Sequence, residues 1–168
     1  MKKINTRTLA VMALLIALEV ILSRFLSINA WNIKIGFSFV PVVIAALLLG
    51  PVCAGTVAAL ADFIGAVLFP IGAYFPGFTL TAFLTGLVFG LFLYPKQSLA
   101  RIAGAVAVNQ LLLSLLLNSF WISVLYGSPF APLLATRTVQ CAILTVVQLV
   151  TIQLIVKALP RLRGLFTS

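Results

Sequence analysis

Six runs of apolar residues divide this chain, and short segments rich in polar residues, proline or glycine separate them. A helix needs about 20 mostly apolar residues to cross the hydrocarbon core of a membrane. Most of the runs approach or exceed that length, and only the second is clearly shorter. The pattern predicts six membrane-spanning helices, at about residues 8–27, 37–49, 52–69, 78–93, 102–126 and 133–159.

Proline and glycine mark the expected ends of these helices. Gly50-Pro51 is a tight-turn signal between the second and third runs. Residues 70–77 contain two prolines and two glycines, so we expect no regular helix there. Residues 28–36 are predicted to form a polar loop, and Pro160 is expected to end the sixth helix.

Composition supports a membrane protein. Hydrophobic residues make up 63% of the 168 residues, charged residues only 8%, and the mean hydropathy is +1.27. Soluble domains carry roughly 25% charged residues, so lipid must cover much of this apolar surface. We predict one all-α membrane domain over residues 1–168. The N-terminal basic and apolar stretch is interpreted as the first transmembrane helix and not as a cleaved signal peptide, because no small-residue cleavage site follows it.

The formal net charge of +9 raises the question of nucleic acid as a partner. The cations are thinly spread between apolar runs, so we interpret them as topology signals and expect no nucleic acid. If the N-terminus lies in the cytoplasm, the C-terminus does too, and most of the 11 cations fall inside, as the positive-inside rule requires. These cytoplasmic cations are Lys2, Lys3, Arg7, Lys96, Arg101, Lys157, Arg161 and Arg163.

Several activities are excluded by missing residue types. The chain has no histidine, only the two carboxylates Glu19 and Asp62, and no P-loop motif. Cys53 and Cys141 lie in separate apolar runs and are interpreted as small core residues. We therefore expect no catalytic acid–base pair, no metal site and no cofactor, and we predict that the protein is not an enzyme.

Arg24, Lys34 and Arg137 lie on the outer half, where topology signalling does not favour positive charge. Ionisable groups within a membrane span are candidates for function. The alternatives are that the cations reach lipid headgroups or pair with Glu19 or Asp62. For Arg24 and Arg137 together we favour an anion-binding role, because a guanidinium grips carboxylate or phosphate with a fork of donors.

Aromatic residues gather near the same outer connections, among them Tyr74, Trp121 and Tyr126. An interfacial aromatic belt is one explanation. However, Asn118 and Trp121 share a face of the fifth run, as a pocket for a flat heteroaromatic ligand would require. Asp62 is either a salt-bridge partner of an outer cation or an acceptor for ligand N–H groups. Glu19 is interpreted as structural.

Small residues four positions apart allow helices to approach closely in lipid. Such pairs occur as Ala13 and Ala17 in the first run, Gly55 and Ala59 in the third, and Gly86 and Gly90 in the fourth. A pair that faces inward serves packing, whereas a pair that faces outward serves a partner helix. The sequence does not decide between these two.

The segments Asp62-Phe-Ile-Gly65 and Phe69-Pro-Ile-Gly-Ala-Tyr-Phe-Pro-Gly-Phe-Thr79 resemble the substrate-binding S components of energy-coupling factor (ECF) vitamin transporters. The resemblance spans nearly the whole chain. It is greatest to the folate-specific branch, through the segments 6–19, 23–28, 36–41 and 121–127. One position departs from that branch. A turn after Arg137 the resemblance leads us to expect a lysine, and this chain has Gln140. We therefore expect the ligand carboxylates to be shared among the cations differently than in that branch.

This resemblance implies a six-helix bundle in the prokaryotic cell membrane that binds one vitamin at its outer side. It also implies partners, namely an EcfT-like membrane coupling subunit, contacted through Ala13 and Ala17, and two cytoplasmic ATPases. We predict high-affinity folate binding for uptake. The alternatives are an S component for riboflavin or pantothenate and a membrane assembly protein without a ligand. The predicted substrate-binding residues are Arg24, Lys34, Asp62, Tyr74, Asn118, Trp121, Tyr126 and Arg137.

Overall fold

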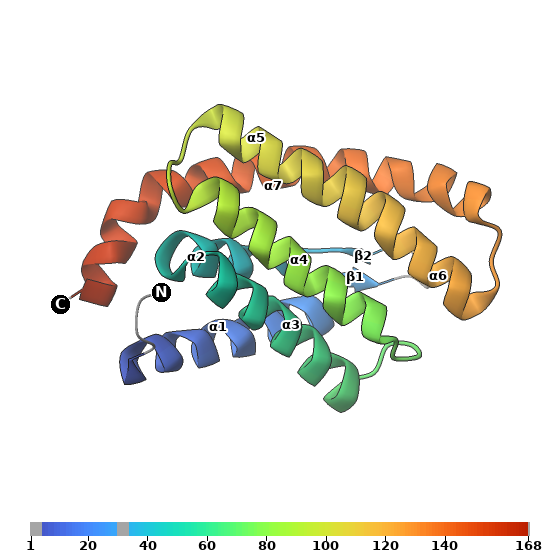
Figure 1. The fold of residues 1–168 in the computed structure, drawn as a ribbon, viewed down its shortest axis with the longest axis horizontal. Helices are drawn as coiled ribbons and strands as arrows, with labels where there is room; N and C mark the ends of the chain where they lie inside the picture. The colour runs from blue at the N-terminus through green and yellow to red at the C-terminus, as the bar shows by residue number, and fades with distance from the viewer. Residues whose placement is uncertain (1–4, 30–33, 168) are drawn as a thin grey trace.

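Helices make up almost all of the described chain (Figure 1). The structure, a computed structural model, describes residues 5–29 and 34–167, with the backbone alone at residues 29, 34 and 160–167. The helices are α1 (Thr6–Arg24), α2 (Phe39–Leu49), α3 (Pro51–Leu68), α4 (Pro76–Leu93), α5 (Leu99–Ala107), the π-helix η1 (Val108–Leu117), α6 (Asn118–Tyr126) and α7 (Phe130–Thr167). A two-stranded antiparallel hairpin, β1 (Ile28–Asn29) and β2 (Lys34–Ile35), lies where a loop was expected.

Five helical stretches are long and apolar enough to cross a membrane: α1, α3, α4, the continuous rod Leu99–Tyr126, and Phe130–Leu159 of α7. The remaining predicted span, the second at residues 37–49, corresponds to α2. With 11 residues, α2 is only about 16 Å long at 1.5 Å per residue. That length is about half of the hydrocarbon thickness.

The short α2 lies at the centre of the bundle and contacts α1, α3, α4 and α7. Val43, Ala45 and Ala46 are completely buried, and Leu47 is nearly so. A helix that is hydrophobic on all faces belongs in an interior. Its surroundings therefore explain why its sequence shows no polar face.

Glycines allow α3 and α4 to pack backbone against backbone. A Cβ atom at Gly86 would collide with the backbone of Ala54, and one at Gly90 with Pro51. The small-residue pattern in α4 therefore serves packing within the bundle. In contrast, Ala13 and Ala17 are exposed on α1. This pair therefore faces away from the bundle and does not pack within it.

The predicted turn at Gly50-Pro51 is confirmed. Gly50 has a φ of 94°, which a residue with a side chain rarely adopts, and Pro51 begins α3. The prediction for residues 70–77 is right only up to Phe75. Pro76 and Gly77 form the first turn of α4, because proline is well tolerated at the first helical position, where its missing N–H has no partner to lose.

The expectation that Pro160 ends the last helix is wrong. The backbone of α7 remains helical to Thr167, and Figure 1 shows α7 bending toward its C-terminal end. A proline inside a helix removes one backbone hydrogen bond and commonly produces a kink instead of an end. Several other boundaries differ from the predicted ones by two or three residues.

The beginning of α1 and the end of α7 lie at the same end of the molecule, together with the α4–α5 connection (Figure 1). The α3–α4 and α6–α7 connections lie at the opposite end. Hereafter this second end is called the mouth end. The rod α5–η1–α6 runs beside α7, and α4 contacts both this rod and the helices α2 and α3.

Candidate functional site

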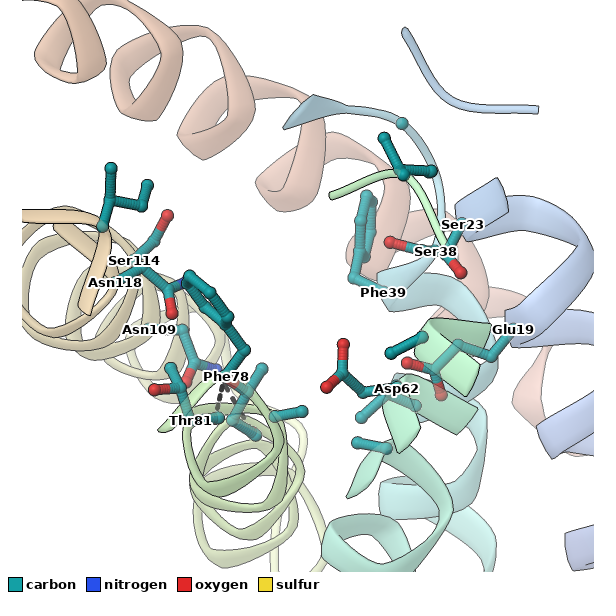
Figure 2. Close-up of a pocket in the computed structure, with 18 of the residues that line it drawn as sticks. Glu19, Ser23, Ser38, Phe39, Asp62, Phe78, Thr81, Asn109, Ser114 and Asn118 are labelled. Atoms are coloured by element: carbon teal, nitrogen blue, oxygen red, sulfur yellow. Dashed lines mark hydrogen bonds between the residues drawn. The ribbon is translucent and has the colours of Figure 1, made fainter. Parts of the chain in front are cut away.

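A cavity of about 630 Å³ lies between the helices and is lined by residues from α1, α2, α3, α4, the α5–η1–α6 rod and α7. Its volume falls in the range of about 300–1,000 Å³ that small-molecule sites occupy. Figure 2 shows Glu19 and Asp62 on one side of the cavity, with Asn109, Ser114 and Asn118 on the opposite side. Polar side chains from distant parts of the chain therefore converge on one space.

Arg24 and Asp62 form an ion pair across α1 and α3, with 4.0 Å between the guanidinium Nη2 and the carboxylate Oδ1. The Thr79 hydroxyl donates to the second carboxylate oxygen at 2.9 Å, and Tyr74 shares a hydrogen bond of 3.3 Å with Thr79. Gly65 leaves room for the guanidinium, because a Cβ there would meet Arg24 Nε. Asp62 is thus the partner of an outer cation. The network joins Tyr74 of the α3–α4 connection to the three helices α1, α3 and α4.

Arg137 is in a different situation. It is only 5% exposed and lines the cavity. Its Nη2 donates to the carbonyl of Ser114 at 3.2 Å, while its Nε has no hydrogen-bond partner. No carboxylate in residues 5–29 and 34–167 forms an ion pair with it. A buried charge is costly unless it is paired, and this guanidinium has no charged partner of opposite sign in the described part of the chain.

One face of the α5–η1–α6 rod lines the cavity along most of its length, with every fourth residue taking part. A regular α-helix would rotate such a row by about 40° at each step. In η1 the hydrogen bonds span five residues, as from the Asn118 N–H to the Leu113 carbonyl, and this wider turn offsets the rotation. The π-helix thereby keeps the row directed at the cavity. Its members are Gln110, Ser114, Asn118, Ile122 and Tyr126.

Trp121 lies behind the cavity wall and is not among the residues that line the cavity. Its indole N–H donates to the Thr81 hydroxyl at 3.0 Å, and its ring packs against Phe75 at a centroid distance of 5.5 Å. Both of those neighbours line the cavity. Trp121 therefore supports the wall from α6 and fixes the position of α4.

Six of the eight predicted substrate-binding residues line the cavity. They are Arg24, Asp62, Tyr74, Asn118, Tyr126 and Arg137. Tyr126 also places its hydroxyl beside Gly72 of the α3–α4 connection. Of the remaining two, Trp121 lies behind the wall, and Lys34 pairs with Asn29 through the backbone of β2, with its side chain outside the described part.

Sequence reasoning missed the polar residues that line the inner part of the cavity. They are Glu19, Asn109, Gln110, Ser114 and Gln148. Glu19, interpreted above as structural, is 9% exposed and faces the cavity. The amides at residues 109, 110 and 148 each interrupt an apolar run. Polar groups in membrane spans mostly face the interior of a bundle, so these amides could have been predicted from the sequence to face a cavity.

Comparison with known proteins identifies the family. The family model for the substrate-specific component of ECF transporters matches residues 7–161. This chain belongs to that family. It is therefore a component of a transporter and not an enzyme, and its five long apolar helices make it a multi-pass membrane protein.

Individual relatives agree with this result. The folate transporter FolT of Clostridium novyi (strain NT) is 43% identical over 145 residues, which cover 86% of this chain and 83% of the relative. The folate transporter FolT of Leuconostoc mesenteroides is 36% identical over 126 residues, with coverages of 74% and 68%. The crystal structure of FolT bound with folic acid superimposes with a TM-score of 0.84 at 35% identity, over 89% of this chain and 92% of that one.

The position of Trp121 leads to a test of its role. Trp121→Phe keeps most of the ring but removes the N–H that donates to Thr81. We expect it to lower the free energy of unfolding by about 1 kcal/mol, the usual net value of one hydrogen bond, and to change ligand affinity less than about threefold. Thermal unfolding in detergent and calorimetric titration measure the two effects. Unchanged stability with an affinity loss above tenfold would show instead that the indole contacts the ligand.

Proposed function

We propose that this chain is the folate-binding S component of an ATP-driven ECF importer in the cell membrane. Folate carries a flat pterin ring and a glutamate tail with two carboxylates. The observation that carries the proposal is Arg137, a buried guanidinium on the cavity wall without a carboxylate partner in the described part of the chain. A ligand carboxylate would supply that partner.

The relatives supply the identity of the ligand. Two proteins with 43% and 36% identity are folate transporters, and the superimposed FolT structure holds folic acid. A cavity of about 630 Å³ is large enough for a ligand of that size. In this proposal Arg24, Lys34 and Arg137 act on the carboxylates, while Asp62, Tyr74, Asn118 and Tyr126 contact the remainder of the ligand and Trp121 supports them.

The proposed topology has six crossings, with α2 as the short buried one and both termini in the cytoplasm. Arg7 lies in the first turn of α1, Lys96 in the α4–α5 connection and Lys157 late in α7. These three segments lie together at one end of the molecule (Figure 1). The positive-inside rule assigns that end to the cytoplasm, so the mouth end faces outward.

The ligand assignment is tested by calorimetric titration of the purified protein in detergent. We expect folate and reduced folates to bind far more tightly than riboflavin or thiamine, because neither of the latter presents two carboxylates to the outer cations. Pantothenate serves as a further comparison, with one carboxylate and no ring. Tighter binding of riboflavin or pantothenate than of folate would contradict the assignment.

The second prediction concerns the outer arginines. Loss of one partner of a desolvated charge pair costs roughly 2–5 kcal/mol. Arg137→Ala and Arg24→Ala are therefore expected to weaken folate binding by about 30-fold or more. Arg24→Ala also leaves Asp62 without its ion-pair partner, so Arg137→Ala is the cleaner variant.

Lys157→Ala is the control for these variants. Lys157 is exposed and stands 20 residues after Arg137, about 30 Å along the same helix. At that distance its charge is screened, so we expect an affinity change below about twofold. Normal folate binding by both arginine variants would refute an anion site. It would indicate instead that the two arginines only stabilise the helix bundle.

Ala13 and Ala17 are proposed to contact the coupling subunit, because they form an exposed small-residue strip on α1. Ala13→Trp is expected to abolish co-purification with the coupling subunit and the two ATPases while folate binding stays within about twofold. Ala142→Trp, at an exposed position on α7, is the matched control and is expected to assemble normally. If Ala13→Trp lost folate binding as well, the strip would serve the bundle itself.

A further inference from the structure

Basic side chains collect at the end of the molecule opposite the mouth end. Lys96 in the α4–α5 connection and Lys157 late in α7 are exposed, and Arg101 in α5 is half-buried. Helix α5 packs against both α4 and α7, and these elements meet at this end of the bundle (Figure 1). These three residues are hereafter called the basic patch.

The positive charge of the basic patch has no acidic counterpart among the described residues. The only side-chain carboxylates of the chain, Glu19 and Asp62, line the cavity. Neither forms an ion pair with the basic patch in residues 5–29 and 34–167. Arg101 donates to the carbonyl of Phe92 at 3.2 Å, which occupies only one of the five N–H groups of a guanidinium. The patch therefore offers positive charge to a molecule outside the chain.

A stripe of exposed apolar side chains on α7 leads directly to Lys157. Its members are three or four residues apart, which places them on one face of the helix, and each is 48% to 64% exposed. They are Val139, Ile143, Val146, Val150 and Leu154. Lys157 continues the same spacing and lies 18 residues after Val139, about 27 Å along the helix. The hydrocarbon core of a membrane is roughly 30 Å thick, so the ammonium group stands where the hydrocarbon ends.

The neighbourhood of Lys96 lies at the same level of the membrane. Tyr94 is 40% exposed and Leu99 is 62% exposed, so apolar surface flanks this lysine on both sides along the chain. Tyrosine is enriched where hydrocarbon meets the headgroups. The cations of the patch and the exposed apolar side chains therefore form one continuous surface at the membrane boundary.

We propose that the basic patch binds the phosphate headgroup of an anionic phospholipid, whose acyl chains lie along the apolar stripe of α7. A phospholipid matches both parts of this surface, because its phosphate faces the cations and its chains cover the stripe. A soluble anion would leave the stripe uncovered. A partner protein on the water side of the membrane would meet the lysines but not the stripe. This inference goes beyond the proposed function and does not depend on the ligand of the cavity.

The experiment compares two lipids on three proteins in a neutral detergent. The lipids are dioleoylphosphatidylglycerol and dioleoylphosphatidylcholine, which have the same acyl chains and differ in net charge. The proteins are the wild type, Lys96→Gln/Lys157→Gln, and the matched control Lys96→Arg/Lys157→Arg, which keeps both charges. Arg101 is left unchanged because it holds the end of α4. Native mass spectrometry measures lipid affinity, and thermal unfolding verifies that each variant is folded.

We expect the wild type to bind phosphatidylglycerol about tenfold or more tightly than phosphatidylcholine. Each cation near an anionic lipid surface contributes about fivefold in affinity, so the double glutamine variant should bind phosphatidylglycerol about tenfold or more weakly than the wild type. The double arginine variant should change by less than about threefold. The other basic residues of this end remain in all three proteins, so the difference between them reports the patch alone.

Folate binding in both variants should stay within about twofold of the wild type, because the patch is remote from the cavity cations. Absence of folate binding to the wild type would contradict the proposed function and would leave the lipid comparison unaffected. If the double glutamine variant does not fold, Lys157→Gln alone repeats the comparison, with an expected loss of about fivefold.

Three results would overturn the inference. In the first, the wild type does not distinguish the two lipids, or the glutamine variant binds phosphatidylglycerol as tightly as the wild type does. In the second, glycerol 3-phosphate, which has the phosphate without the chains, binds as tightly as the lipid, so the stripe takes no part. In the third, the glutamine variant loses co-purification with the coupling subunit at unchanged lipid affinity, which would assign the patch to a protein contact.

Discussion

A guanidinium buried in an apolar helix bundle must have an anion or a set of hydrogen-bond acceptors beside it, because lipid and apolar side chains offer neither. The two arginines of the cavity meet this requirement differently. Arg24 pairs with Asp62, and Thr79 and Tyr74 extend that pair to the α3–α4 connection. Among the described residues, Arg137 donates to a backbone carbonyl and has no carboxylate partner. One cation of the cavity is therefore already paired with a carboxylate of the chain, whereas the other is not.

The scaffold around these charges is built from close helix contacts. Gly86 and Gly90 bring α4 against the backbone of α3, and the fully apolar α2 fills the centre. On the other side, η1 keeps a row of residues from Gln110 to Tyr126, most of them polar, directed at the cavity. A rigid wall of this kind favours preorganised binding, in which side chains lose little freedom when a ligand arrives.

Part of the site was readable from the sequence because a membrane makes polar residues conspicuous. Arg24, Asp62, Asn118 and Arg137 interrupt apolar runs, so each stood out without any knowledge of the fold, and all four line the cavity. Glu19 interrupts a run too. It was interpreted as structural, and it lines the same cavity. Its spacing from Arg24 along α1 suggested a separate face, and spacing along one helix does not reveal what the other helices enclose.

The sequence by itself determined the apolar helices, the turn at Gly50-Pro51 and the family resemblance, since each depends on local composition or a contiguous motif. Only the tertiary structure decided that Ala13 faces outward while Gly90 faces α3, that α7 continues past residue 160, and that Asn109 meets Thr85 in the cavity lining. The physical reason is the same in these cases. A residue's local pattern sets what it can do, whereas its role depends on neighbours that are distant in the chain and brought close only by packing.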